Sequence, residues 1–225
     1  MTYTLRIALD DRPGSLARIA AALGDVGANI VELDVLERSV DLAVDQLVVQ
    51  APGRTGQEVR DAIDGVDGAT VEVLRPTRRH AGLPPLGLAV RLARADGGDL
   101  LRTLADGTVV TFEGTWAAIV RDRSPQTEVL AASAGAPSFL DVPTPWLPLR
   151  DVRRIPSGSW TPPDWLRADE PLALAAAPLR SADEALVVCR PYGPRFAQRE
   201  LGDLAMLADL AVAELARAEA DAALV

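Results

Sequence analysis

The stretch LDDRPGSLARIAAALGDVGANI, residues 9–30, decides how the first third of the chain folds. It follows YTLRIAL (residues 3–9), an alternating run that is typical of a strand. Pro13 and Gly14 break this strand. From Ser15 onward, apolar residues recur at the i, i+3, i+4 spacing of a helix with one buried face. That predicted face consists of Leu16, Ile19, Ala20, Leu23 and Val26.

Gly27 predicts the end of the helix, because glycine is common just past a helix C-terminus. Two runs after it predict strands: NIVELDVLER and LAVDQLVVQ, residues 29–38 and 42–50. In the first run apolar residues alternate with acidic ones, so we expect the apolar set to face a core. That set is Val31, Leu33 and Val35. A short helix around residues 58–63 and a strand at 69–76 follow. The predicted order is β-α-β-β-α-β, the ferredoxin-like arrangement of an α+β domain.

The remainder of the chain predicts a second α+β domain, with antiparallel strands between helices. We expect a first domain at residues 1–76, a linker at 77–84 and a second domain at 85–225. The second domain begins with the mainly helical LGLAVRLARADGGDLLRTLADG and ends in a long helix over residues 198–217. Its expected strands are residues 116–121, 128–132, 172–179 and 185–190.

One segment of the second domain, residues 141–171, holds seven of the 17 prolines and three of the four tryptophans, Trp146, Trp160 and Trp165. A long segment without regular structure is either functional or disordered, and tryptophans give it something to bury. We expect it to pack over a sheet face; the alternative is a lid on a pocket.

The first 75 residues resemble an ACT domain. The motif that carries the resemblance is DRPGSLARIAAAL followed by GANI, an Asp-Arg-Pro-Gly turn before a helix and a Gly-x-Asn-Ile entry to the next strand. The resemblance implies a regulatory domain that binds an amino acid or a related small molecule, pairs through its sheet and holds its ligand near the interface. Matched position by position, the implied ligand-binding residues are Asp11, Gly14, Ser15, Leu16, Asn29 and Ile30.

The second domain resembles a GAF domain, through LVVCRPYGPRFAQRELGDLAMLADLAVAEL at its C-terminal end. A strand, a Pro/Gly turn, Phe196 and a Glu that opens the last helix recur in that family. The position after Phe196 is Ala197, so Glu200 lacks the Ser or Thr that completes a capping box. The resemblance implies a module that binds small ligands or dimerises.

Composition excludes several classes of function. The chain carries 23 basic and 32 acidic residues, a net charge of -9, which disfavours nucleic acid and an anionic membrane surface as partners. All the basic residues are arginine, so Schiff-base chemistry and a Walker-type loop are absent. One histidine, His80, and one cysteine, Cys189, do not make a metal or nucleophile site, and we expect no catalytic residues, metal or cofactor. No signal peptide or membrane span is visible, which predicts a cytoplasmic protein.

The DRPGS turn has two readings. In the structural one Asp11 starts the turn, Pro13 fixes φ, Gly14 permits unusual backbone angles and Ser15 caps the helix. In the functional one the helix start offers free N–H groups to a carboxylate. Asp11 would then accept the ammonium group of a zwitterion, and Asn29 would offer both a donor and an acceptor at the start of the next strand.

We therefore expect a non-enzymatic regulatory protein whose ACT domain binds an amino acid or similar metabolite. We further expect a homodimer, because pairing would cover an exposed strand edge. Its signal would pass to a protein partner that the sequence does not identify. The main alternative is a dimerisation and interaction scaffold without a small-molecule ligand. A further alternative is an enzyme that uses carboxylates or backbone donors in the second domain.

Overall fold

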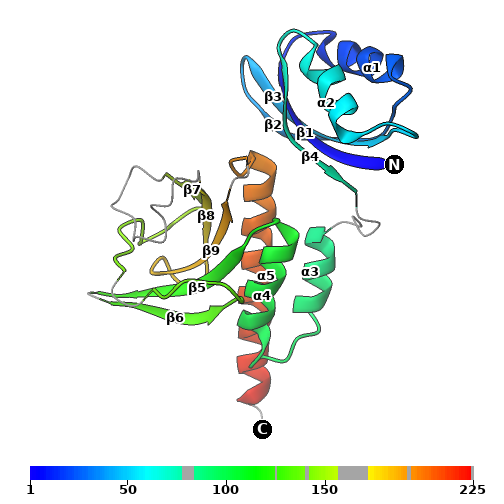
Figure 1. Cartoon of the computed structure of the whole chain (residues 1–225). Helices are drawn as coiled ribbons and strands as arrows, with labels where there is room; N and C mark the ends of the chain where they lie inside the picture. The colour runs from blue at the N-terminus through cyan, green and yellow to red at the C-terminus, as the bar shows by residue number, and fades with distance from the viewer. Residues whose placement is uncertain (78–83, 125, 140–141, 157–171, 192–193, 224–225) are drawn as a thin grey trace. The chain divides into compact units, whose positions relative to one another are not determined.

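The computed structural model describes residues 1–77, 84–124, 126–139, 142–156, 172–191 and 194–223, shown in Figure 1. The chain divides into two compact units. The first comprises Met1–Ala81 with Ala197–Arg199, and the second comprises Gly82–Phe196 and Glu200–Val225. Part of the predicted linker, and Trp160 and Trp165, lie outside the described residues.

The first unit has the predicted order of strands and helices. Its elements are β1 (Thr2–Asp10), α1 (Ser15–Asp25), β2 (Asn29–Arg38), β3 (Leu42–Gln50), α2 (Gly56–Asp64) and β4 (Ala69–Pro76). The strands form one antiparallel sheet in the order β2-β3-β1-β4. The central strand β1 therefore pairs on both sides, whereas β2 and β4 are edges.

The core of the first unit lies between this sheet and the two helices. Leu5 and Ile7 of β1 are fully buried, together with Ile19 and Leu23 of α1. The helix buries its face as the i, i+4 spacing predicts, but that face is rotated. Ser15 is buried, whereas Leu16 and Ala20 of the predicted face are exposed.

The prediction for β2 is wrong in one respect, because the apolar set that we expected to face the core is exposed. The exposed fractions are 61% for Val31, 41% for Leu33 and 45% for Val35. Two irregularities in the pairing with β3, one near each end of β2, shift the register of this edge strand. The apolar alternation is real, but no element of the first unit among the described residues covers it.

The second unit consists of α3 (Pro84–Leu92), α4 (Leu100–Thr111), β5 (Trp116–Arg123), β6 (Gln126–Ala132), β7 (Arg153–Ile155), β8 (Leu172–Pro178), β9 (Glu184–Pro191) and α5 (Gln198–Ala222). Its strands form an antiparallel sheet in the order β6-β5-β9-β8-β7. The antiparallel sheet with flanking helices agrees with the GAF-like expectation. The N-terminal helical stretch is two helices, α3 and α4, and the short β7 was not predicted.

The sheet of the second unit is covered on both faces. On one face, Ile119 and Val188 pack with Leu104 of α4 and Leu204 of α5. On the other face, the segment that precedes β7 supplies the cover. Its buried residues include Phe139, Trp146, Leu147 and Leu149. Packing over a sheet face, the expectation for this proline- and tryptophan-rich segment, is thus observed for its described part.

Candidate functional site

The turn between β1 and α1 places Gly14, not Ser15, at the N-cap of α1. Gly14 has φ 90° and ψ -5°, a left-handed conformation that glycine adopts without steric cost, and α1 begins at Ser15. The expectation that Ser15 caps the helix is therefore wrong. The Ser15 hydroxyl instead accepts a hydrogen bond from Arg18 Nη2 at 3.2 Å.

The two helices of the first unit differ at their N-terminal ends. At α2, the Thr55 hydroxyl accepts from the Glu58 backbone N–H, and the Glu58 carboxylate accepts from the Thr55 N–H at 2.8 Å, a capping box. At α1, no side chain caps the helix and no acidic residue lies in the first turn. The start of α1 thus lacks the side-chain acceptors that satisfy the start of α2.

A groove of about 510 Å³ lies beside this open helix start. Gly14 and Arg18 contribute from the α1 side. Gly68 and its neighbour come from the turn between α2 and β4, which is brought alongside because the Asp10 N–H donates to the Gly68 carbonyl at 2.9 Å. The full lining is Asp10, Arg12, Pro13, Gly14, Arg18, Asp67 and Gly68.

The groove carries charges of both signs. Asp10 and Asp67 supply carboxylates, and Arg12 and Arg18 supply guanidinium groups. Arg12 Nη2 lies 3.7 Å from Asp10 Oδ2, so this pair is loose. A lining with two carboxylates, which bind cations, and two guanidinium groups, which bind anions, is complementary to a small zwitterion.

Gly68 keeps the groove open at its far side. Its φ is +77°, and an added Cβ would lie 2.6 Å from Asp10 Oδ2. Any other residue here would be strained and would push against the Asp10 carboxylate. By contrast, an added Cβ at Gly14 would meet no atom within 4 Å, so it would project into open space.

Asp11 lies at the same turn but is already paired. Arg38 at the end of β2 donates through Nε to Asp11 Oδ2 at 2.5 Å and through Nη2 to Oδ1 at 3.0 Å. This bidentate contact with Arg38 lowers the pKa of Asp11 below its usual value. A ligand's ammonium group therefore has to compete with a resident guanidinium for this carboxylate.

Asn29 and Ile30 lie at the other end of the sheet. Asn29 pairs with Gln50, which also pairs with Thr2 at the start of β1, whereas Asp10 at the end of β1 pairs with Leu42. Because a strand rises about 3.3 Å per residue, the two ends of β1 are separated by roughly 26 Å. Asp11 and Asn29 of one chain thus do not hold one small ligand together.

Of the six predicted ligand-binding residues, only Gly14 lines the groove. The four charged groove residues, Asp10, Arg12, Arg18 and Asp67, were not predicted. Arg12 and Arg18 lie within the quoted motif and Asp10 directly precedes it, which is a signal that was available. Asp67 was not predictable from local pattern, because only the pairing of β1 with β4 brings it alongside.

In the second unit, Cys189 and the arginines near β7 have the chemistry to bind a ligand or an anion. Cys189 of β9 is buried, and burial raises the pKa of its thiol to about 11. Arg153 Nη2 donates to the Trp146 carbonyl at 2.7 Å, and Arg154 Nε donates to the Phe196 carbonyl. These two arginines therefore hold the chain, while Arg150 is exposed.

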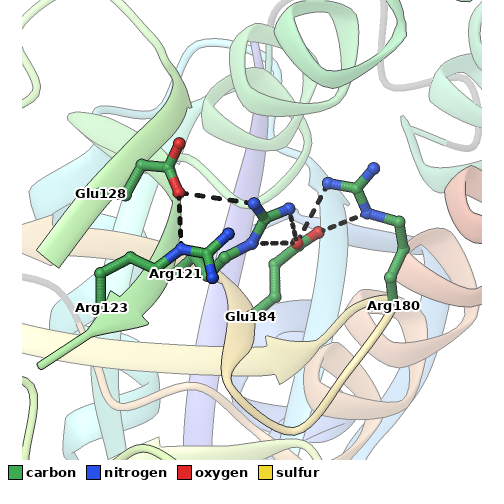
Figure 2. Close-up of polar contacts among 5 residues, drawn as sticks. All are labelled: Arg121, Arg123, Glu128, Arg180 and Glu184. Atoms are coloured by element: carbon green, nitrogen blue, oxygen red, sulfur yellow. Dashed lines mark hydrogen bonds and ion pairs between the residues drawn. The ribbon is translucent and has the colours of Figure 1, made fainter.

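A network of five charged residues lies at one end of the second sheet (Figure 2). The Glu184 carboxylate is nearly fully buried and accepts from Arg121 Nη2 at 2.7 Å and from Arg180 Nε at 2.9 Å. Glu128 in turn accepts from Arg121 and Arg123 at 3.4 and 3.2 Å. Every member has a protein partner, so this network ties β5, β6 and β9 together.

The segment that carries the GAF resemblance is organised around a buried arginine, Arg190. Its guanidinium donates to the Phe112 carbonyl at the end of α4 at 2.6 Å and to Glu200 Oε1 at 2.6 Å, and it lies 4.3 Å from the Phe196 ring centroid. Glu200, which lacks a capping partner at Ala197, is thus bound by Arg190 instead.

Within the described part of the chain, no helix is both long and apolar enough to cross a membrane. Nor do its His, Cys, Asp and Glu side chains form any group of three that is placed to hold a metal ion.

No family model matches the sequence, and no curated protein matches it. Among solved structures, the chain is similar to the GAF domain of a phosphoenolpyruvate-protein phosphotransferase from Coxiella burnetii, at 12% identity and a TM-score of 0.48, covering 64% of this chain and 99% of that one. The phycoerythrobilin-bound GAF domain of a cyanobacterial phytochrome gives 15% identity and a TM-score of 0.46, covering 63% and 100%. A GAF domain from an Acinetobacter phosphoenolpyruvate-protein phosphotransferase gives 15% and 0.43, covering 60% and 94%.

At these identities and TM-scores the likeness assigns the chain to no family, and none of the three structures is an ACT domain. What the fold and the groove define is a two-unit α+β protein with a mixed-charge groove at an uncapped helix start.

Proposed function

We propose that this chain is a non-enzymatic, cytoplasmic regulatory protein whose first unit is an ACT-type domain that binds a free amino acid or a similar zwitterion. The observation that carries the proposal is the uncapped start of α1 beside a groove with two carboxylates and two guanidinium groups. Backbone N–H groups and arginines suit the ligand's carboxylate. Asp10 and Asp67 in the groove, and Asp11 at the same turn once Arg38 is displaced from it, suit the ammonium group. We propose the second unit as a GAF-type module that relays the signal to a protein partner.

The exposed edge of β2 supports a homodimer as the working form. Val31, Leu33 and Val35 expose an apolar stripe on a strand whose outer edge has no partner strand among the described residues. Pairing of β2 with β2 of a second copy would give this edge a partner and bring the two apolar stripes side by side. In an antiparallel pairing centred on Leu33 and Asp34, the Asn29 end of one copy lies beside the Arg38 end of the other. Asn29 and Ile30 then join the Asp11 turn across the interface, as the ACT resemblance implies.

A thermal-shift panel of the twenty amino acids tests the ligand. A ligand at about a hundred times its dissociation constant adds roughly 2.7 kcal/mol to the state that binds it. We expect a selective rise in melting temperature that Arg18→Gln abolishes, because it removes a groove cation. The matched control is Arg91→Gln, which removes one exposed arginine from α3 and should leave the rise intact.

Asn29→Ala tests whether the site is shared between copies. We expect it to abolish the ligand response while the dimer persists. A response that survives Asn29→Ala but not Arg18→Gln would confine the site to the groove of one chain.

The second candidate function is a scaffold that dimerises and binds proteins without a small-molecule ligand. Two observations favour it: Asp11 is already paired with Arg38, and Phe139 and Trp146 fill one face of the second sheet. A flat amino-acid panel with an intact dimer would make this the better description.

A further inference from the structure

Asp45 of the first unit has a buried carboxylate oxygen without a hydrogen-bond donor among the described residues. The residue lies on β3, only 2% of it is exposed, and the oxygen is Oδ1. Burial and the nearby Asp11 carboxylate raise the pKa of Asp45, while Arg38 lowers it. A buried carboxylate oxygen without a hydrogen-bond donor lowers the stability of the fold, so a functional role for Asp45 is worth considering.

The sheet register shows which groups surround Asp45. Its direct neighbours are Ile7 on β1 and Val35 on β2, which are apolar and offer no donor through their side chains. Arg38 pairs with Ala43, two residues from Asp45 on the same strand, and therefore on the same face of the sheet. Such diagonal neighbours are about 7–8 Å apart, within reach of a long side chain.

Arg38 thus has two carboxylates within reach and bonds to one of them. Arg38 donates two hydrogen bonds to Asp11, at 2.5 and 3.0 Å. Its side chain is 72% exposed, so it can turn through solvent without disturbing the core.

We propose that Asp45 is a positioning residue for the ligand site: Arg38 leaves Asp11 for the free carboxylate oxygen of Asp45 when an ammonium group takes its place on Asp11. This assignment rests on the proposed function for the identity of the incoming group. The exchange of Arg38 between two carboxylates is a property of the three residues themselves.

The movement of Arg38 from Asp11 to Asp45 changes the number of ion pairs after ligand binding. Without Asp45, a ligand that displaces Arg38 would leave the guanidinium without a carboxylate partner. With Asp45, the number of ion pairs rises by one, because the ligand pairs with Asp11 and Arg38 pairs with Asp45. The site therefore selects ligands that carry a cationic group, and simple carboxylates do not trigger the exchange.

A test without any ligand uses Asp11→Asn, which removes the negative charge that pairs with Arg38, as a bound ammonium group would neutralise it. The pKa of Asp45 is followed by carboxyl carbon-13 NMR in the unmodified protein, Asp11→Asn, Arg38→Gln and the double variant. Loss of the Asp11 charge alone lowers the Asp45 pKa equally with and without Arg38. Movement of Arg38 onto Asp45 adds a further fall of about 1–3 units only where Arg38 is present, the effect of a cation placed beside a carboxylate.

Equal falls in the two backgrounds would overturn the proposal. The altered side chains are at the exposed rim of the unit, and an unchanged amide spectrum elsewhere establishes that each variant folds. Because no ligand is added, a flat amino-acid panel with unequal falls would reject the proposed function and retain the exchange. A ligand response with equal falls in the Asp45 pKa would retain the proposed function and reject the exchange.

Discussion

Cys189 illustrates how burial sets the chemistry of a single residue. The thiol is 1% exposed on β9, and its pKa is raised to about 11, so it is neutral at pH 8. Since the thiolate is the nucleophile, we expect a disulfide reagent to leave the native protein unlabelled at pH 8 and to label one equivalent after unfolding. Equal labelling rates for the two states would show that β9 is not buried.

Asp45 gives a residue-scale prediction about pH. A carboxyl whose pKa is raised on folding binds protons more tightly in the folded state, so the free energy of unfolding falls as pH rises through the interval between its unfolded and folded pKa values. Asp45→Asn removes this titration. We expect the variant to gain stability relative to the unmodified protein from acidic to neutral pH, measured by urea unfolding at several pH values. A difference that is constant with pH would contradict the direction of the shift.

Arg190 is the residue on which the end of the second unit depends most. Arg190→Met leaves the Phe112 carbonyl and the largely buried Glu200 without this donor, and removal of one partner of a buried pair typically costs about 3–5 kcal/mol. The free energy of chemical unfolding measures the loss. Adding Glu200→Gln to this variant should recover part of it, because no charge is then left behind. A loss below about 1 kcal/mol would mean that solvent replaces these contacts.

At the scale of elements, strand and helix order was predictable because it is encoded in local periodicity. The turn DRPGS, the alternation of β1 and the 3.6-residue spacing of α1 each require only a few neighbouring residues. Burial was less predictable, as β2 shows: alternation reveals that a strand has two faces, but only the sheet order reveals that β2 is an edge strand, where the apolar face stays exposed. The split between α3 and α4 was missed because both share one amphipathic pattern.

The contact between α3 and α4 leads to a prediction at this scale. An added Cβ at Gly107 of α4 would lie 2.1 Å from Leu88 Cδ1, and the neighbouring atoms of the buried Leu88 are also within about 3 Å. We expect Gly107→Ala to lower the free energy of unfolding by about 1–3 kcal/mol through overpacking, despite the better helix propensity of alanine.

The matched control is Gly202→Ala in α5, where an added Cβ meets no atom within 4 Å. This variant should gain about 0.5–1 kcal/mol. If both variants gained stability, α3 would not pack on α4 as closely as described.

At the scale of the whole molecule, the exposed stripe on β2 predicts the oligomeric state. Val31→Lys with Val35→Lys would place four added positive charges near one two-fold axis of the proposed dimer, and we expect the dimer to dissociate in sedimentation analysis. Val110→Lys is the control, since Val110 is also an exposed valine but lies on α4. A dimer that survives the β2 changes and not the control would move the interface to the second unit.

The candidate site depends on how distant parts of the chain come together, and for that reason only part of it was predictable from the sequence. Gly14 was identified because its role is local. Asp67 reaches the groove through strand pairing, and Asn29 lies at the far end of the sheet, so it would reach the turn only in the proposed dimer. Residues that share a motif are thus neighbours in the chain, but a site is made of neighbours in space.

The network around Glu184 also leads to an expectation about the order in which its ion pairs form during folding. Arg180 is four residues from Glu184, within one hairpin, whereas Arg121 is 63 residues away on β5. The nearer pair closes a short loop and forms early, but the distant one requires β5 to dock beside β9 first. The carboxylate is thus half satisfied while the hairpin stands alone and fully satisfied only when the sheet is assembled. Substitution of Arg121 should therefore speed unfolding more than it slows folding, as for a contact made after the transition state.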